Sequence, residues 1–514
     1  MTLRRIARKA IFSSAGIALA LLLPGCPMIL GLDKDYTDIG QADSGADANT
    51  PDTPADTPPE NACGNGRLVC SGNCIDVTSD PNNCGVCDKK CAMGFTCAMS
   101  ACGNDVVQLA AGGYHACVVL RAGKVWCWGN NTLAAVAQPA MGDMTCGTQK
   151  CRPTPTDTGL DLVQEVALAA NSGCARKADG TVWCWGSSTL GQLGHATNTS
   201  GDVMCGMTAC NPKPTQVMNL PSVTQIAAGY SHYCALTASG AVYCWGSNTS
   251  GELGRGTAFG GSSPSAQLVP ALAGNVKQIS SGLGYLTCAL KMDGTVWCWG
   301  TNARGALGHA PNVDPVDGAL QPYNSTPQQV LKDAQNNPFT PVERVSTQWQ
   351  GACAKKGGWY CWGFNGRAGL GLGGSFDTAN HAAPAAVTVV PTTIATLGHG
   401  FETPCAIDTT GKLFCWGRND WGAIGDGTFA GLTCEGNVPC RPDAQPIAAI
   451  GTVDMIAAGS LFAVARKTDG TIWSWGANPD ARLGHMPGAG GDAMTCAAGT
   501  TQCNTKPTQV MGLP

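Results

Sequence analysis

Charged residues are scarce in this 514-residue chain, at 13% of the sequence, and the formal net charge is only −4. Nucleic-acid-binding domains usually carry a strongly basic patch, so the composition predicts no nucleic-acid partner. The chain also lacks a Gly-x-Ser-x-Gly elbow, a phosphate-binding loop and a His-Glu-x-x-His pair, which are common signatures of catalytic sites. We therefore expect a protein that is not an enzyme, with no catalytic residues, no metal site and no cofactor.

Long apolar runs are missing too, because the run Ile11–Leu23 is too short to span a bilayer comfortably. It follows a basic start that includes Arg4 and Arg5, a pattern typical of an export signal. The run ends in Leu-Pro-Gly-Cys26, which resembles a bacterial lipoprotein box, although Pro24 departs from the usual residue there. We predict a signal peptide over residues 1–25, lipidation of Cys26, and anchorage to the bacterial cell envelope at the outer membrane or cell surface. The alternative is cleavage of the signal elsewhere.

Two short regions precede the main part of the chain. Residues 26–61 are dominated by Asp, Thr, Pro and Ala, and such a segment cannot bury enough apolar surface to fold, so we predict a disordered acidic tether. Residues 62–103 hold eight cysteines, which leaves zinc binding open around Cys84-x-x-Cys87. In an exported chain a disulfide framework is favoured, and the sequence does not assign its connectivity. The eight are Cys63, Cys70, Cys74, Cys84, Cys87, Cys91, Cys97 and Cys102.

What the chain has in abundance is glycine, with 69 residues, and a repeated aromatic motif. Val125-Trp-Cys-Trp-Gly129 recurs with small changes, and the second aromatic residue of successive copies is spaced by 57, 60, 54, 63, 54 and 59 residues. Seven copies at a nearly fixed period indicate a repeat architecture. Alternating apolar residues and glycine-bearing turns within each copy predict strands, and hence an all-β protein. The second aromatic residues are Trp128, Trp185, Trp245, Trp299, Trp362, Trp416 and Trp475.

Cysteine pairs test this interpretation. Within most copies two cysteines lie ten residues apart, on either side of a turn such as Asp179-Gly180. Such a spacing places them opposite each other in a hairpin, close enough for a disulfide. The predicted hairpin pairs are Cys117/Cys127, Cys174/Cys184, Cys234/Cys244, Cys288/Cys298, Cys353/Cys361 and Cys405/Cys415. In the last copy both positions change together, to Val464 and Ser474, as expected for partners.

Eight further cysteines lie in long loops that follow the aromatic strand, which we call exit loops. Each pair is close in sequence, so we predict that each closes its own small loop. The predicted pairs are Cys146/Cys151, Cys205/Cys210, Cys434/Cys440 and Cys496/Cys503.

The ends of the repeat array also complement each other. A Pro-Thr-Gln-Val segment such as Pro214–Val217 precedes the internal copies but not the first, and the chain ends in a further copy, Lys506–Pro514. We therefore predict a seven-bladed β-propeller over residues 105–514, whose C-terminal strand completes the first blade and closes the ring.

The unit Ile226-Ala-Ala-Gly229, followed by His232-x-Cys-Ala-Leu236 and Gly240-x-Val-x-x-Trp-Gly246, resembles the regulator of chromosome condensation repeat. This resemblance implies the seven-bladed propeller. Eukaryotic members of that family exchange nucleotide on the Ran GTPase and contact chromatin, whereas a resembling branch comprises secreted bacterial β-lactamase inhibitors. The cysteine pairs depart from the common pattern.

We expect a monomeric binding module that uses loops at one propeller face to bind a protein or a surface polymer. Loops vary freely while the blades fix their positions, and the least repetitive exit loops are the best candidates: 132–157, 197–212, 257–270 and 311–341. The alternatives are a secreted enzyme inhibitor and, with less support, a guanine nucleotide exchange factor. The binding residues are not identified by the sequence.

Several other residues could suggest a ligand-binding or metal site, but we interpret most of them as structural. The tryptophans of the motif are expected to pack between blades, which leaves Trp349 and Trp421 as candidate binding aromatics. The Leu-Gly-His histidines occupy equivalent places in different copies, too far apart for a shared metal; they are His195, His309 and His485. Gly-Asp pairs in the exit loops suit turns better than calcium; they end in Asp143, Asp202, Asp426 and Asp492.

Overall fold

A computed structural model describes residues 63, 67–91, 97–98, 101–102, 105–139, 141–256, 261–272, 274–316, 321–374, 377, 379–429, 431–492, 496–497 and 502–514. The chain divides into two units, Met1–Pro58 and Pro59–Pro514. The predicted signal peptide, Cys26 and the predicted tether lie outside the described residues. Among the residues described, no helix is long and apolar enough to cross a membrane.

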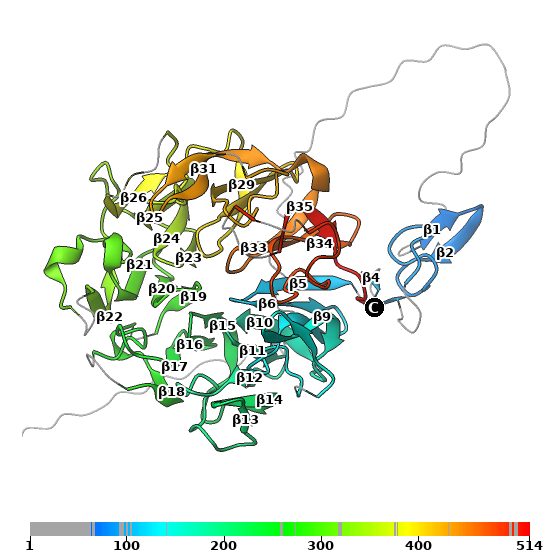
Figure 1. Cartoon of the computed structure of the whole chain (residues 1–514), viewed down its shortest axis with the longest axis horizontal. Helices are drawn as coiled ribbons and strands as arrows, with labels where there is room; N and C mark the ends of the chain where they lie inside the picture. The colour runs from blue at the N-terminus through cyan, green and yellow to red at the C-terminus, as the bar shows by residue number, and fades with distance from the viewer. Residues whose placement is uncertain are drawn as a thin grey trace, which may run out of the picture. The chain divides into compact units, whose positions relative to one another are not determined.

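Seven antiparallel sheets are arranged around a centre, with strands such as β10, β15, β19 and β23 toward the middle and β14, β18 and β22 at the rim (Figure 1). This confirms the all-β, seven-bladed propeller.

Each blade consists of four strands in chain order from the centre outward, and three blades gain a fifth strand at the edge. Blade 1 contains β5 (Val106–Ala111), β6 (His115–Leu120), β7 (Val125–Asn130) and β9 (Gln149–Asp157), with β8 (Met144–Cys146) at its edge. Blade 2 contains β10 (Val163–Leu168), β11 (Ser172–Lys177), β12 (Val182–Ser187) and β14 (Thr208–Gln216), with β13 (Val203–Cys205). Blade 3 contains β15 (Val223–Ala228), β16 (His232–Thr237), β17 (Val242–Gly246) and β18 (Ser263–Leu268).

Blade 4 contains β19 (Val276–Ser281), β20 (Leu286–Lys291), β21 (Val296–Thr301) and β22 (Tyr323–Gln329). Blade 5 contains β23 (Arg344–Gln348), β24 (Gly351–Lys356), β25 (Gly358–Phe364) and β26 (Asn380–Ala386). Blade 6 contains β27 (Ile394–Gly398), β28 (Cys405–Asp408), β29 (Leu413–Arg418) and β31 (Val438–Pro446), with β30 (Leu432–Cys434). Blade 7 contains β32 (Val453–Ala458), β33 (Phe462–Lys467), β34 (Ile472–Ala477) and β35 (Cys503–Gln509).

The helical segments of the described part are short 3-10 turns: η1 (Pro270–Leu272), η2 (Ala303–Gly305), η3 (Pro311–Val313) and η4 (Ala448–Ile450). The β6–β7 turn and its equivalents require glycine, because Gly180 and Gly240 have φ of 80° and 76°, which residues with a Cβ rarely adopt.

The second tryptophan of each motif joins neighbouring blades. All seven are fully buried between sheets, and six donate the indole N–H to a backbone carbonyl in the exit loop of the preceding blade. Examples are Trp185 to Ala135 O at 2.9 Å and Trp299 to Glu252 O at 2.7 Å. Each of these six indoles therefore buries a large apolar surface and also satisfies a buried carbonyl that lies outside any ladder. The first aromatic residue is less uniform: Trp183 is only partly buried and packs against the cluster between blades 1 and 2, whereas Phe414 is buried.

A glutamine on several innermost strands adds a second link between blades. The Gln108 side chain donates to Val166 O at 3.0 Å and accepts from Val166 N at 2.8 Å. Gln225 makes the same pair of bonds with Ile279 of the next blade. A single side-chain amide thus supplies hydrogen-bond partners for both the N–H and the C=O of one residue in the next blade. That residue lies on the innermost strand, where these two groups have no partner in their own sheet.

The predicted closure of the ring by the C-terminal strand is wrong. β35 pairs with β34 of its own blade, placing Trp473 opposite Gln509, and blade 1 is completed by its own β9, in which Thr156 lies opposite Cys127. The Pro-Thr-Gln-Val segments follow the aromatic strand of their own blade, as Trp183 opposite Gln216 also shows. Each sequence repeat therefore coincides with one complete blade, and the terminal Pro-Thr-Gln-Val copy is the ordinary outer strand of blade 7.

Blades 7 and 1 are joined by side chains instead. Trp128 donates to Arg482 O at 3.0 Å, and Arg466 donates to Val106 O. Val118, Phe462 and other apolar residues of both blades form one buried cluster across the junction. This junction thus uses the same packing as the other six.

Disulfides join the predicted hairpin partners in six blades, with Cα–Cα distances of 4.0 to 4.1 Å. The bonds are Cys117–Cys127, Cys174–Cys184, Cys234–Cys244, Cys288–Cys298, Cys353–Cys361 and Cys405–Cys415. In blade 7, Val464 lies opposite Ser474 at the equivalent position. The exit-loop cysteines also bond as predicted, as Cys146–Cys151, Cys205–Cys210, Cys434–Cys440 and Cys496–Cys503.

The cysteine-rich region contains two small hairpins, β1 (Arg67–Cys70) with β2 (Asn73–Asp76) and β3 (Cys97–Ala98) with β4 (Ala101–Cys102). Its disulfides are Cys63–Cys74, Cys70–Cys87 and Cys84–Cys97, and Cys91 is also disulfide-bonded. Cys84 and Cys87 therefore belong to separate disulfides rather than to a zinc site.

The inter-blade indole bond can be tested with two matched variants. Trp299→Phe removes an N–H that is bonded to Glu252 O, whereas Trp416→Phe removes an N–H that has no partner among the described residues. Both side chains are fully buried and lose the same volume. We expect Trp299→Phe to lower the free energy of unfolding by about 1–2 kcal/mol more than Trp416→Phe, because it leaves a buried carbonyl unpaired. Denaturant titration of the oxidised proteins measures this, and equal losses would contradict the role of the bond.

Candidate functional site: the loop face and the channel mouth

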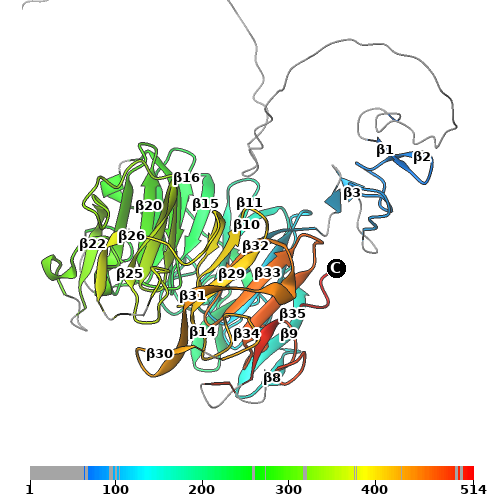
Figure 2. The same cartoon turned by 90° about the horizontal axis from the view of Figure 1, so that it is seen from above.

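One face of the propeller carries two kinds of connection, and we call it the loop face. These are the short inner loops, which join the first strand of a blade to the second, and the exit loops, which join the third strand to the outer one. The opposite face, here called the hairpin face, carries the tight turns of the β6–β7 type. In Figure 2 the edge strands β8 and β30 project from the same side of the blades. The predicted binding segments 132–157, 197–212, 257–270 and 311–341 each include part of an exit loop, but they also include all or part of the outer strands β9, β14, β18 and β22. The segment 311–341 extends beyond β22 into the connection that leads to blade 5.

Aromatic side chains gather on the loop face around the channel mouth, four of them on inner loops and Phe364 at the end of β25. Tyr230 and Tyr285 lie with ring centroids 5.4 Å apart, and Trp349 stacks on Phe401 at 4.2 Å. Phe364 meets the Trp349 ring edge-on at 6.3 Å. All five side chains are only partly buried. We call these five residues the mouth aromatics.

Tyr114, on the inner loop of blade 1, extends this group. Burial, together with the neighbouring Tyr114 and Tyr285, raises the pKa of Tyr230 to about 12. Burial also raises the pKa of Tyr285, with a further contribution from the Glu252 carboxylate. The phenols therefore stay protonated at neutral pH and present hydroxyl groups beside apolar rings.

Paired charges lie directly beside the mouth aromatics. The Glu402 carboxylate, which is 4% exposed, accepts from Arg367 at 3.0 Å and from Arg418 at 2.9 Å, and Arg418 also binds Asp420 at 2.7 Å. Burial raises the pKa of Glu402, whereas the two guanidinium groups oppose that change. Because Glu402 follows Phe401 directly, this network fixes the inner loop of blade 6 and holds the stacked ring in place.

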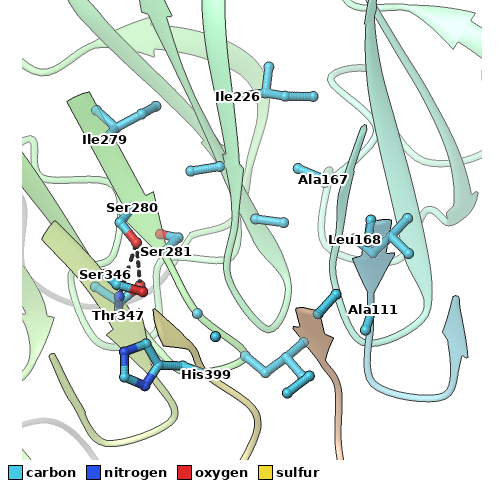
Figure 3. A pocket seen from close by; sticks show the side chains of 18 of the residues that line it. Ala111, Ala167, Leu168, Ile226, Ile279, Ser280, Ser281, Ser346, Thr347 and His399 are labelled. Carbon is cyan, nitrogen blue, oxygen red and sulfur yellow. Dashed lines mark hydrogen bonds between the residues drawn. The ribbon is translucent and has the colours of Figure 1, made fainter. Parts of the chain in front are cut away.

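A cavity of about 340 Å³ occupies the channel (Figure 3). Its walls come from the innermost strands and include Leu168, Ile226 and Ile279, with no charged side chain among the lining residues. Hydroxyl groups gather on blades 4 and 5, where Ser280 Oγ lies 3.0 Å from Thr347 Oγ1. His399 also lines the cavity, and its ring nitrogens have no hydrogen-bond partner in the described part of the chain.

Several exit loops are held by an aspartate that pairs with a histidine of the same loop or with an arginine of the outer strand that follows it. His195 and His485 bind Asp202 and Asp492 at 2.9 and 3.0 Å. Arg152 pairs with Asp143 at 2.5 Å, and His309 and Arg441 make equivalent pairs with Asp314 and Asp426. The Gly-Asp and Leu-Gly-His residues singled out in the sequence therefore staple their own loops. In the described residues no group of three or more histidines, cysteines or acids is arranged to hold a metal ion.

Of the two tryptophans outside the repeated motif, Trp349 is one of the mouth aromatics, and Trp421 lies partly buried in the exit loop of blade 6. Sequence reasoning missed Tyr230, Tyr285 and Phe401. The available signal was local: these bulky residues interrupt the small residues that usually end the innermost strand and form its loop.

Comparison with known proteins identifies the class of this protein. A family model described as an RCC1-like domain matches residues 62–433, well over half of the chain. The chain therefore belongs to the RCC1-like domain family, which confirms the family predicted from the repeats.

Similarity to particular proteins is more distant. The Ultraviolet-B receptor UVR8 of Arabidopsis thaliana is 26% identical over 390 residues, which cover 74% of this chain and 79% of that protein. The E3 ubiquitin-protein ligase HERC2 of Homo sapiens is 28% identical over 390 residues, but these cover only 7% of that protein. A chain in the crystal structure of Kap60 bound to yeast RCC1 (Prp20) superimposes with a TM-score of 0.61 at 18% identity, covering 79% of this chain and 85% of that chain. The structure of Prp20p from Saccharomyces cerevisiae, whose description names its binding properties to Gsp1p and histones, has a TM-score of 0.59 at 17% identity, covering 80% and 88%. At these identities the structural matches show the fold alone.

Buried histidines next to the inner loops give a pH prediction. Burial and the nearby Arg482 lower the pKa of His115 to about 3, and burial alone lowers that of His232 to about 3. The unfolded chain then binds more protons than the folded one between pH 6.5 and 3, so stability falls as the pH drops through that window. Leu286 occupies the position of His115 in blade 4, opposite Gly300 as His115 is opposite Gly129.

We therefore expect His115→Leu to reduce the pH dependence of the unfolding free energy by up to about 1.4 kcal/mol per pH unit in this window. Denaturant titrations at a series of pH values, with the disulfides intact, provide the measurement. An unchanged slope would show that His115 is already charged in the folded protein.

Proposed function

We propose that this protein is a binding module whose loop face takes up a protein partner at the channel mouth. The observation that carries the proposal is the group of mouth aromatics, which are partly exposed although the chain has few aromatic residues outside its repeats. Tyrosine, tryptophan and arginine are enriched at the energetic centres of protein interfaces. Trp349 and Phe401 also have fixed orientations through the Glu402 ion pairs, so little side-chain entropy is lost on binding.

The arrangement around the mouth supports the same proposal. Exit loops closed by disulfides, such as Cys146–Cys151 and Cys205–Cys210, lie on the same face as the mouth aromatics. They also carry exposed apolar side chains at their tips, since Met141, Met204 and Met207 are 89%, 61% and 98% exposed. Methionine adapts its shape to irregular partner surfaces. A rigid centre with adaptable tips suits a protein surface larger than a single small molecule.

The descriptions of proteins with this fold support a role in binding other proteins. The names of the similar structures mention Kap60, Gsp1p and histones as proteins bound by yeast Prp20. The identities of those bound proteins are not carried over, because the structural similarity extends to the fold alone. The name of HERC2 gives a ligase activity, but the match covers a small part of that protein, so we propose a non-enzymatic role for this chain.

We further propose that the module works outside the cytoplasm, tethered to the bacterial envelope through Cys26. The support is the basic and apolar start of the sequence together with the disulfides, which persist in oxidising compartments. A lipid anchor would hold the loop face within reach of partners at the envelope.

Binding at the mouth can be tested with two double variants. Tyr285→Ala with Trp349→Ala removes two mouth aromatics, whereas Trp297→Ala with Trp473→Ala removes two partly buried rings of the hairpin face, where lysines lie over them. Oxidised full-length protein would be exposed to envelope and secreted proteins, and the bound protein quantified by mass spectrometry. We expect saturable binding of a protein that falls at least about tenfold in the mouth variant and is kept by the hairpin-face variant.

Equal loss in both variants, or equal retention, would contradict a site at the mouth. Retention of a polysaccharide with no protein would overturn the choice of a protein partner. Melting temperatures of both variants show whether either change has unfolded the propeller.

Lipidation can be checked independently. Expression in a bacterial host fed a labelled fatty acid should label the wild-type chain, and Cys26→Ser should abolish the label because it removes the acceptor thiol. A label that persists in Cys26→Ser, or its absence from the wild type, would contradict anchorage through this residue.

A further inference from the structure

A second recess on the loop face lies at the junction of blades 7, 1 and 2, and we call it the seam cleft. Its volume is about 880 Å³, which is in the range of small-molecule sites. Tyr114 enters it from the inner loop of blade 1 and Asn171 from that of blade 2. Thr148, at the tip of the β8–β9 hairpin, and Gln502, in the exit loop of blade 7, complete the opposite walls.

The floor of the seam cleft contains one positive and one negative side chain, so it has no net charge. Arg482 binds Asp480 through two parallel bonds of 2.6 and 2.8 Å, and these side chains are only 5% and 4% exposed. Arg482 also donates to Ser460 O at 2.9 Å, and Asn130 donates to Asp480 at 3.3 Å. Because no other charged residue lines the cleft, a charged ligand would lose hydration without finding a counter-charge. The floor therefore favours an uncharged ligand.

The walls offer unused hydrogen-bonding groups. The side chains of Asn171, Thr148 and Gln502 line the cleft and make no hydrogen bond to the described residues. Gln149 uses its amide oxygen to accept from Thr132 at 2.7 Å, which leaves its amide N–H groups for another partner. Amides and hydroxyls can both donate and accept, which matches a ligand that is rich in hydroxyl groups.

Little of the lining suits an apolar ligand. Leu133 and Pro479 are its larger aliphatic residues, and the one aromatic ring is that of Tyr114. The Arg482 guanidinium lies 5.0 Å from the centroid of this ring and holds it in place, while the tyrosine remains partly exposed. A fixed ring beside many neutral polar groups can pack against the C–H face of a pyranose while the ring hydroxyls meet the amides.

We propose that the seam cleft binds a neutral saccharide, packed on Tyr114 and hydrogen-bonded by Asn171, Thr148 and Gln502. This site goes beyond the proposed protein interface, because neither member of the mouth double variant lines it. The saccharide is a free sugar or a unit of a surface polymer, since both present the same ring and hydroxyl groups.

Ligand-observed NMR on the oxidised full chain tests the proposal with glucose, galactose, mannose and N-acetylglucosamine as probes. We expect at least one of them to bind saturably in the millimolar range typical of small, hydrated ligands. Asn171→Ala with Thr148→Val should weaken that binding at least about tenfold, because two hydrogen-bonding groups are lost. Thr189→Val is the matched control, since it changes an exposed threonine in the exit loop of blade 2 that does not line the cleft.

The mouth variant Tyr285→Ala with Trp349→Ala should bind the sugar as the wild type does, so failure of the protein interface and failure of this site are distinguishable. Tighter binding of a longer oligosaccharide of the same sugar would support a polymer as the source, and equal binding would support the free sugar. The proposal is overturned if none of the probes binds saturably, if the Asn171→Ala/Thr148→Val protein binds as tightly as the Thr189→Val protein, or if gluconate or glucosamine binds better than glucose.

Discussion

The structure depends on the contact between one blade and the next, which the second tryptophan of each repeat makes. A blade by itself exposes an apolar face on both sides, and the buried indole covers the face of the neighbouring blade. In six of the seven blades its N–H also binds a carbonyl of the neighbouring exit loop. Because that carbonyl belongs to the loop and not to a strand, the same bond that joins two blades also fixes where the exit loop begins. Packing of the core and placement of the functional face are therefore coupled.

This coupling explains how the ring closes without a shared strand. Many ring-shaped folds could be held by exchanging a strand between the first and last repeats, yet here blade 7 keeps β35 and blade 1 keeps β9. That junction is held by hydrogen bonds from Trp128 and Arg466 and by the buried apolar cluster around Phe462. At other junctions indole and glutamine side chains make the corresponding bonds. The residues at the junction of blades 7 and 1 can therefore differ from the repeat consensus. Asp480 and Arg482 are such residues, and their buried ion pair forms the floor of the seam cleft, with no net charge.

The loop face shows how rigid supports and variable groups are combined. Aspartates such as Asp202 and Asp492 have buried side chains that pair with a histidine in their own loop, and a disulfide follows each of them along the chain. With the loop backbones fixed in this way, a few residues per blade can change without disturbing the fold. The mouth aromatics and the residues that line the seam cleft both occupy loop positions of this kind. The first group is largely apolar, whereas the second is polar and has no net charge.

The sequence by itself determined the fold class, the number of blades, the strands that bear the tryptophans and the hairpin partners of the cysteines. These follow from local spacing: a period near 58 residues, a turn that requires glycine, and two cysteines equally distant from it. Only the tertiary structure decided which blade each outer strand joins, because a Pro-Thr-Gln-Val segment lies between two aromatic strands in sequence and can be assigned to either. It also decided where Tyr230 meets Tyr285 and where Trp349 stacks on Phe401, since each pair comes from two repeats that pack side by side only in the folded ring. Spacing along the chain fixes what lies within one repeat, whereas a site shared between repeats depends on the angle at which rigid blades pack.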